Sequence, residues 1–260
     1  MFDFTIVIVA YHNYQDIVNA VKTVDCFTAK EISKKLYVID NSCLEPTAPE
    51  KLAFLKKLSE YSFVEYRDTG KNLGFGGGHN YVMQELDSQL HIIMNPDILL
   101  TEDSLFQIRE FMKDESIGMC VPRLTDEAGE MQLVYRREIT LFDMFVRMFC
   151  KNVFKKRFAY HTMQDCDFSS PMNVPFAQGS FLVIRTALYK ELGGFDERYF
   201  MYMEDADLCR RVNQVSRLVY DPYTSVIHKW EKGSHKNKRL FQIHAQSMFS
   251  YFRKWGWKFF

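Results

Sequence analysis

The sequence predicts an α/β fold in a single domain, with a mainly parallel central sheet flanked by helices. Short apolar segments alternate with helix-like segments through the first hundred residues, a pattern typical of parallel strands joined by helical crossovers. The first apolar segment, 4–10, is continuous and rich in β-branched residues, as in a strand that is buried on both faces. The 260 residues are 47% hydrophobic, enough for one large core. No shift in composition marks a linker.

The first half of the chain is the more regular one. Strands are expected at 4–10, 36–40, 62–66 and 91–94, and helices at 16–27, 51–58 and from a glycine-rich opening at 72–80 to about residue 86. Asp40 and Asp97 fall at the ends of two of these strands. Because ligands of such sheets bind beyond the carboxyl ends of the strands, we interpret residues 1–100 as a nucleotide-binding half.

The second half, 101–239, is less regular and is interpreted as the substrate-binding half. Helices are expected at 103–113, 140–158, 186–192 and 240–260, and strands at 118–122, 174–185, 218–220 and 225–227. Segments 140–158 and 240–260 both mix aromatic with basic residues. Each can be an amphipathic helix docked on the domain or a contact with a membrane or an acceptor lipid.

Composition excludes several classes of protein. The 33 basic and 33 acidic residues cancel, so no global field attracts nucleic acid. Six scattered cysteines without a CxxC pair indicate reduced, mostly buried thiols, with neither a disulfide framework nor a zinc site. Segment 4–10 is too short to span a bilayer and follows no basic region, so it is expected to be a strand rather than a signal peptide. We expect a cytoplasmic protein that could touch the inner face of the cell membrane.

An acidic stretch stands out in the second half. Its five acids are Asp196, Glu197, Glu204, Asp205 and Asp207. Carboxylates this close repel one another and need a cation, partner arginines or a proton used in chemistry. Asp207 precedes Arg210 and Arg211 by three and four residues, the spacing of a helical ion pair. Glu204 and Asp205 fall at the start of that helix, where acids are favoured, so a capped surface helix is the alternative interpretation.

Three further motifs are chemically suggestive. The four glycines within 72–80 allow the backbone to approach an anionic ligand, or form a tight turn. Asp97 can face a pyrophosphate only through a divalent cation, and otherwise forms an Asx-type turn. His228 can complete the coordination of that cation, or be a core histidine.

Taken together and in this order, these segments resemble family 2 glycosyltransferases of the GT-A fold. They are most similar to the rhamnosyltransferase branch that builds bacterial capsules, O-antigens and cell-wall glycans. The segments that carry the resemblance are 6–13, 38–42, 72–80, 95–97, 179–185, 193–197, 204–210 and His228.

The resemblance implies roles for individual residues. Asp205 would be the catalytic base, and Asp97 and His228 would hold Mn²⁺ or Mg²⁺. Asn95 replaces the first acid of the family's DxD motif, so one carboxylate would hold the metal. The nucleotide-sugar site would comprise Ala10, Tyr11, Asn13, Asp40, Asn72, Gly74, Phe75, Gly78, Asn80, Asn95, Gly179 and Glu204.

The resemblance also implies substrates and partners. The donor would be a dTDP- or UDP-sugar, with dTDP-rhamnose the leading candidate, and the acceptor a glycan or an undecaprenyl-linked glycan. Transfer would invert the anomeric centre; peripheral membrane contact and a homodimer are further candidates. One alternative is a non-catalytic binding subunit of a polysaccharide assembly complex. Another is a sugar nucleotidyltransferase, which would need a basic, glycine-rich loop where Tyr11, His12 and Asn13 stand.

Overall fold

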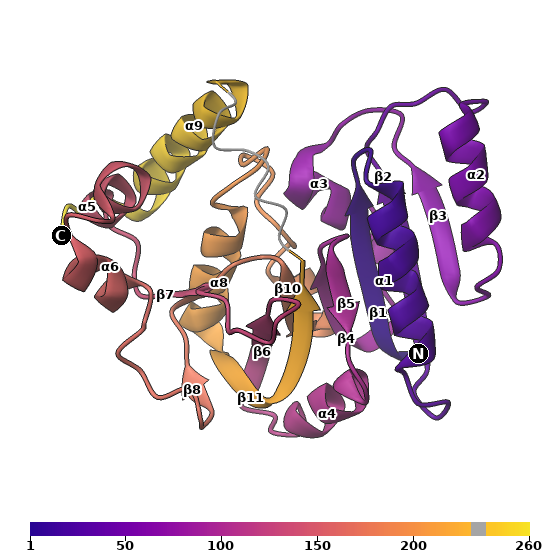
Figure 1. The fold of residues 1–260 in the computed structure, drawn as a ribbon, viewed down its shortest axis with the longest axis horizontal. Coiled ribbons are helices and arrows are strands. Elements are labelled where there is room, and N and C mark those ends of the chain that lie inside the picture. The colour runs from indigo at the N-terminus through magenta and orange to yellow at the C-terminus, as the bar shows by residue number, and fades with distance from the viewer. Residues whose placement is uncertain (230–237) are drawn as a thin grey trace.

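A computed structural model describes residues 1–229 and 238–260 (Figure 1). One large sheet has the strand order β3-β2-β1-β4-β10-β6-β11-β5, with β8 paired to β11. Its strands are β1 (Phe2–Ala10), β2 (Lys34–Asp40), β3 (Val64–Asp68), β4 (Ser88–Met94), β5 (Ile98–Leu100), β6 (Ile117–Thr125), β8 (Met172–Asn173), β10 (Phe181–Arg185) and β11 (Arg217–His228). A second, two-stranded sheet pairs β7 (Tyr135–Arg136) with β9 (Phe176–Ala177).

The α/β fold with a mainly parallel sheet is confirmed. Strands β1 to β4 run parallel to one another, as do β6 and β11, whereas β10 and β5 are antiparallel to their neighbours. Ile6, Val7 and Ile8 of β1 are wholly buried, which means that both faces of this strand are covered. Because β10 lies between β4 and β6, and β5 pairs with β11, the two halves of the chain share one sheet.

Helices cover the sheet and extend beyond one end of it (Figure 1). They are α1 (Tyr14–Cys26), α2 (Pro49–Leu58), α3 (Gly74–Asn80), α4 (Ser104–Phe111), α5 (Leu141–Phe145), α6 (Lys155–His161), α7 (Thr186–Glu191), α8 (Glu204–Val215) and α9 (Lys238–Trp255), with a 3₁₀ turn at Met83–Glu85 and a π-helical turn at Val146–Cys150. In Figure 1, α5, α6 and α9 gather at the end of the molecule opposite α2. None of the helices described is both long enough and apolar enough to cross a membrane.

Several local expectations were wrong. The expected helix 140–158 is interrupted, because the π-helical turn separates α5 from α6. The expected helix 240–260 is α9, which ends at Trp255, and Gly256 then takes a φ of 90°. Strands 218–220 and 225–227 are one strand, β11, with a register shift between Asp221 and Ser225.

The residues after α9 fold back onto α5. The amide of Leu141 donates to the carbonyl of Lys258 at 2.9 Å, and that of Phe142 donates to the carbonyl of Phe259 at 3.1 Å. These bonds satisfy two of the free amides at the start of α5 and place the C-terminal residues beside the helical segment 141–161.

The thiols are less buried than expected. Cys120 and Cys209 are buried, but Cys26 and Cys43 are exposed, and all six cysteines are free. The expectation that most of them are buried was therefore wrong.

Candidate active site

The acidic pair Glu204–Asp205 opens helix α8, as the sequence predicts. Tyr202 and Met203, just before it, both have φ values of 71°, so the chain turns sharply into the helix. Asp205 Oδ2 accepts the amide of Gly179 at 3.0 Å, and its Oδ1 accepts the amide of Ala206 at 2.8 Å. Both oxygens are thus oriented by backbone donors.

The two neighbouring carboxyl groups differ in what stabilises their charge. Burial raises the pKa of Glu204 well above its usual value, and the charge of Asp205 raises it further. Burial also raises the pKa of Asp205, but the amides of Gly179 and Ala206 and the charge of Arg147 oppose that rise. Glu204 Oε2 has no hydrogen-bond partner among the described residues. A proton shared by the pair therefore belongs on Glu204, which leaves Asp205 ionised and able to accept a proton.

A cavity of about 210 Å³ lies in front of this pair. Four predicted site residues besides Asp205 line it, namely Phe75, Asn95, Gly179 and Glu204. Its other walls come from the second half of the chain: Arg136, Ile139, Met144, Arg147, His161, Phe176, Gln178, Ser180, Met201, Tyr202, Met203 and His244. The cavity therefore combines apolar side chains with carboxyl, guanidinium and imidazole groups, and it is large enough for a sugar-sized group.

The predicted metal ligands Asp97 and His228 also come together. The pairing of β5 with β11 sets His228 opposite Ile98, and His228 Nε2 lies 3.4 Å from Asp97 Oδ2. The amide of Lys229 donates to the carbonyl of Asp97 at 3.0 Å, which fixes the backbone of both residues.

Gln132 determines which nitrogen of His228 faces Asp97. Its Nε2 donates to the carbonyl of His228 at 2.7 Å, so its Oε1 is the atom 2.7 Å from His228 Nδ1. Nδ1 then carries the hydrogen, and in the neutral ring the lone pair of Nε2 points to the Asp97 carboxylate. A cation between these two acceptors would satisfy both of them. The donor set, one carboxylate oxygen and one oriented imidazole, fits Mn²⁺ or Mg²⁺ with further ligands from phosphate and water.

A short backbone connection joins the two parts of the site. The amide of Asn95 donates to the carbonyl of Ser180 at 2.8 Å. Asn95 lies two residues before Asp97, and Ser180 follows the Gly179 that holds Asp205. The carboxyl end of β4 therefore sets the distance between the metal ligands and the acidic pair.

The predicted nucleotide residues at the ends of β1 and β2 lie next to one another. Ala10 pairs with Asp40 in the parallel register, and its carbonyl accepts the amide of Asn41 at 2.9 Å. The Tyr11 ring is 55% exposed, and Asn13 Oδ1 accepts the Tyr11 amide at 2.9 Å. This edge offers an exposed aromatic surface of the kind on which a base can stack.

Asp40 is more enclosed than the prediction implied. Its carboxylate is 1% exposed and accepts the hydroxyls of Tyr14 and Tyr66, each at 2.7 Å, and the amide of Ser42 at 2.9 Å. These bonds hold the Asp40 carboxylate in place at the end of β2. A role in holding ribose stays a prediction.

The glycine-rich opening of the expected helix is itself helical, and α3 ends at Asn80 rather than near residue 86. In α3, a Cβ on Gly78 would lie 2.8 Å from both γ-carbons of Val9, and one on Gly74, whose φ is 74°, would lie 2.0 Å from the carbonyl of Phe200. The glycines therefore allow α3 to pack against β1 and against the chain before α8. Asn72 Oδ1 accepts the amide of Gly74 at 2.9 Å.

Within α3, Phe75 reaches the cavity but Asn80 does not line it. Asn80 Nδ2 donates to the carbonyl of Phe195, and its Oδ1 accepts the amide of the same residue. Its Oδ1 also accepts the hydroxyl of Tyr189. The structure thus uses Asn80 to hold the turn that leads to the acidic stretch.

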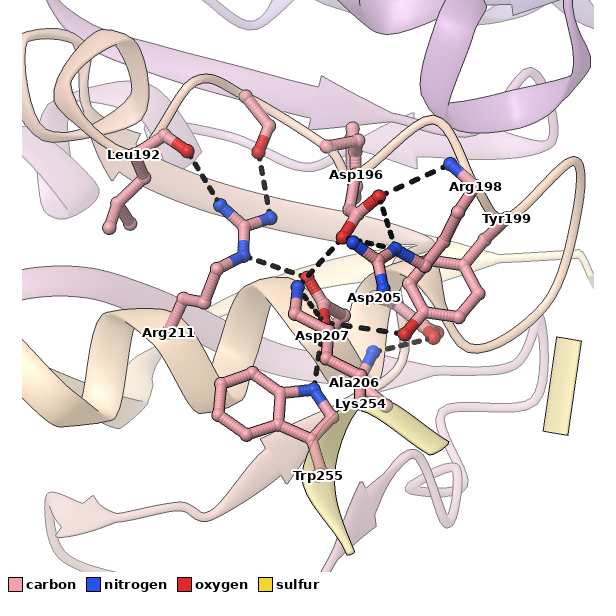
Figure 2. A network of polar contacts seen from close by, with 12 residues as sticks. Leu192, Asp196, Arg198, Tyr199, Asp205, Ala206, Asp207, Arg211, Lys254 and Trp255 are labelled. Carbon is pink, nitrogen blue, oxygen red and sulfur yellow. Dashed lines mark hydrogen bonds and ion pairs between the residues drawn. The ribbon is translucent and has the colours of Figure 1, made fainter. Parts of the chain in front are cut away.

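Asp207 belongs to a separate charge network, drawn in Figure 2. Its carboxylate is wholly buried and pairs with Arg211 at 2.7 Å, one of the two arginines predicted from the sequence. Lys254 at 2.6 Å and the indole Nε1 of Trp255 at 2.8 Å reach it from α9. Lys254 also pairs with Asp196 at 2.7 Å. The network fastens α9 to α8 and leaves Asp207 out of the cavity.

Sequence reasoning missed Arg136, His161, Gln178 and His244 on the second-half side of the cavity, and it noted Arg147 only as a basic residue of the segment 140–158. They come from short, irregular elements, and no spacing motif connects them. The sequence sets neither arginine apart from acids, because Glu138 lies two residues after Arg136 and Asp143 lies four residues before Arg147.

The profile of "Glycosyl transferase family 2" matches residues 5–193. Because this match covers well over half of the chain, the protein belongs to that family and is a glycosyltransferase.

The relatives confirm the rhamnosyltransferase-like resemblance. The chain is similar to "Rhamnosyltransferase WbbL" of Escherichia coli (strain K12), with 26% identity over 94% of this chain and 91% of that protein. It is also similar to the "N-acetylglucosaminyl-diphospho-decaprenol L-rhamnosyltransferase" of Mycobacterium tuberculosis (strain CDC 1551 / Oshkosh), with 28% identity over 66% of this chain and 60% of that protein.

Solved structures confirm the GT-A fold. GalNAc-T7 with UDP, GalNAc and Mn²⁺ superposes with a TM-score of 0.64 at 16% identity, over 90% of this chain and 45% of that one. The mannosyltransferase PcManGT from Pyrobaculum calidifontis, in complex with GDP-Man and Mn²⁺, gives a TM-score of 0.63 at 11% identity, over 97% of this chain and 64% of that one. The chain thus spans less than two thirds of either solved chain.

Proposed function

We propose that this glycosyltransferase moves a sugar, L-rhamnose from dTDP-rhamnose in the first instance, to a glycan or undecaprenyl-linked glycan, with inversion and with a divalent metal. The observation that carries the proposal is the connection between the two carboxylate sites. Asn95 and Ser180 join the Asp97–His228 pair to the cavity in front of Asp205. The similarity to two rhamnosyltransferases favours the sugar, and the diphospho-decaprenol in the name of one of them favours a lipid-linked acceptor.

Asp97 and His228 are the residues that would hold Mn²⁺ or Mg²⁺, which supplies positive charge against the departing nucleoside diphosphate. Asp205 accepts the proton of the attacking acceptor hydroxyl. The amides of Gly179 and Ala206 keep its carboxylate aimed and ionised. Glu204 stays protonated beside it and adds no second negative charge. A single displacement needs only this one protein base, and it inverts the anomeric centre.

The donor is proposed to lie along the edge formed by Ala10, Tyr11, Asn13 and Asp40, with its sugar directed toward Phe75 and Asn95. The exposed Tyr11 ring and the oriented strand ends support this path. Asn72, Gly74, Gly78 and Asn80 support the path indirectly, because their contacts position α3 and Phe75.

The test is a donor panel with Mn²⁺ and a lipid-linked acceptor, followed by nucleoside diphosphate release and NMR of the product. Consumption of dTDP-rhamnose with inverted anomeric configuration is expected, together with loss of turnover in EDTA. Donor binding without transfer would favour the alternative of a non-catalytic binding subunit. Release of pyrophosphate from dTTP and a sugar phosphate would favour the nucleotidyltransferase.

We also propose a peripheral position at the inner face of the cell membrane. The aromatic–basic surface lies where the C-terminal residues meet segment 141–161, near the C-terminus in Figure 1. Its exposed aromatic residues include Phe145, Phe149, Phe154, Trp257, Phe259 and Phe260, and exposed Lys151, Lys155, Lys156, Arg253 and Lys258 accompany them. Aromatic rings and lysines are the side chains that bind the interface of anionic bilayers.

Co-sedimentation with phosphatidylglycerol vesicles tests this surface. The wild-type protein is expected to pellet with anionic vesicles and to stay in solution with phosphatidylcholine alone. A variant with Trp257, Phe259 and Phe260 changed to serine should remain in solution, and Phe106→Ser on α4 is the control for an exposed aromatic residue outside the surface. Equal pelleting of all three proteins would remove the membrane proposal. The homodimer stays a prediction, which light scattering can test by giving the molar mass of the protein in solution.

A further inference from the structure

The cavity contains two arginines that no carboxylate neutralises at close range. Arg136 lies on β7 and is 7% exposed, whereas Arg147 lies on the exposed side of the π-helical turn. Among the described residues, neither guanidinium has an acidic partner within ion-pair distance. In the part of the chain that the structure describes, Arg136 Nη1 donates to the carbonyls of Leu133 and Tyr135, and its buried Nε has no partner.

Two other arginines of the second half each have a carboxylate partner. Arg211 pairs with Asp207 at 2.7 Å and Arg157 pairs with Asp143 at 2.6 Å. A cation as buried as Arg136 is costly unless an anion accompanies it. Burial and the charge of Arg147 lower the pKa of Arg136 to about 9, and the charge of Asp205 only partly opposes this.

The other titratable groups of the cavity do not balance the two arginines. Burial lowers the pKa of His161 and of His244 to about 4, so both are neutral near pH 7. Glu204 holds its proton, as its raised pKa implies. Among the described residues, Asp205 is then the one carboxylate whose charge acts on both guanidinium groups, and an excess of positive charge remains.

We propose that Arg136 and Arg147 form a binding site for a phosphate or diphosphate group of the acceptor. The fork of guanidinium N–H donors matches phosphate oxygens. The Ser180 hydroxyl, which is buried and without a partner among the described residues, lines the same cavity and can add a further donor. This inference rests on the proposed function, since it takes the cavity as the place where acceptor meets Asp205.

The donor also carries a diphosphate, but its negative charge already has a place at Asp97 and His228. Those two residues do not line the cavity, whereas both arginines do. The arginines come from the second half of the chain and line the same cavity as Asp205. An acceptor whose sugar is joined to a lipid through diphosphate would thus be held by its charged linkage with its hydroxyl near the base.

Calorimetry with inorganic pyrophosphate in EDTA tests the site without requiring turnover. Wild-type protein is expected to bind, and Arg147→Gln and Arg136→Lys should each weaken binding by about 10-fold or more, the usual loss for a hydrogen bond to a charged group. Arg147 is exposed, so its variant should fold normally. Arg253→Gln, an exposed arginine on α9, is the matched control and should bind as the wild type does. Equal pyrophosphate affinity in all four proteins would overturn the proposal.

A second titration, with dTDP and Mn²⁺, separates acceptor from donor. The affinity for dTDP should be unchanged in Arg147→Gln, while the KM for a diphospho-lipid acceptor rises. Weaker dTDP binding with an unchanged acceptor KM would assign the arginines to the donor and overturn the acceptor site. Wild-type protein that binds pyrophosphate yet transfers no sugar would contradict the proposed function and leave the anion site in place.

Discussion

Replacing Asp207 by asparagine tests whether the acidic stretch contains one structural and one chemical carboxylate. Asp207 is wholly buried, and it receives Arg211, Lys254 and the indole N–H of Trp255 within 2.6–2.8 Å. Asparagine keeps the shape of the side chain but removes the charge that these donors neutralise. The expected result is lower stability with chemistry retained, because Asp207 does not line the cavity.

The size of the loss follows from burial and from the remaining partners. Removing one member of a buried ion pair typically costs about 3–5 kcal/mol. Arg211 keeps its bonds to the carbonyls of Leu192 and Gly194, and Lys254 keeps Asp196. Both cations are also partly exposed, at 14% and 21%. We therefore expect Asp207→Asn to lose about 2–4 kcal/mol of unfolding free energy.

Urea denaturation gives this free energy, with rate at saturating donor measured beside it. Asp196→Asn is the matched control. Its carboxylate is 18% exposed, its partner Arg198 is 50% exposed, and its second partner Lys254 keeps Asp207, so about 1 kcal/mol or less is expected. A loss below about 1 kcal/mol for Asp207→Asn would refute the assignment of a buried ion pair. Loss of turnover at full stability would mean that Asp207 takes part in the chemistry.

Three further outcomes are expected. Burial raises the pKa of Glu204 in the folded protein above its pKa in the unfolded chain. The unfolding free energy of the wild type should therefore fall, by up to about 1.4 kcal/mol per pH unit, as the pH rises from the unfolded-state pKa toward the folded-state pKa. Glu204→Gln should remove this pH dependence when stability is measured by thermal unfolding from pH 5 to 8. The same pH dependence in the wild type and the variant would contradict this explanation. Gly78→Ala should lower the unfolding free energy by about 1–3 kcal/mol, because the added methyl group would press against Val9. The control Gly77→Ala should change the melting temperature little. Equal effects of the two substitutions would exclude packing against Val9 as the cause. Gln132→Ala should weaken Mn²⁺ affinity about 10- to 100-fold, because Gln132 orients the imidazole of His228. Unchanged affinity would mean that His228 is not a metal ligand.

The sequence predicts the parts of the fold that depend on local pattern. The β-branched run 4–10 could be assigned because burial on both faces of a parallel strand leaves no polar alternation. Asp40 and Asp97 could be placed on one edge because parallel strands end together. Arg211 could be named as a partner of Asp207 because helical spacing sets that distance.

Other parts depend on contacts between distant segments. Glycine is a poor helix former, so 72–80 resembles a loop until packing against Val9 and Phe200 makes it a helix. The meeting of His228 with Asp97 depends on the pairing of β5 with β11, so the sequence left open whether His228 is a metal ligand or a core histidine. Arg136 and Arg147 carry no local signal, since their significance lies in the absence of a carboxylate partner among the described residues.

The most direct test of the proposed mechanism is Asp205→Asn, with product formation measured at saturating dTDP-rhamnose and Mn²⁺ and with donor affinity measured by calorimetry. Turnover should fall about 10²- to 10⁴-fold, the usual contribution of a positioned base. Donor affinity should stay near the wild-type value, because the amide keeps the shape that faces Gly179. Asp97→Ala, by contrast, should lose both metal-dependent donor binding and turnover. Transfer by Asp205→Asn at a rate near that of the wild type would contradict the role of Asp205 as the base.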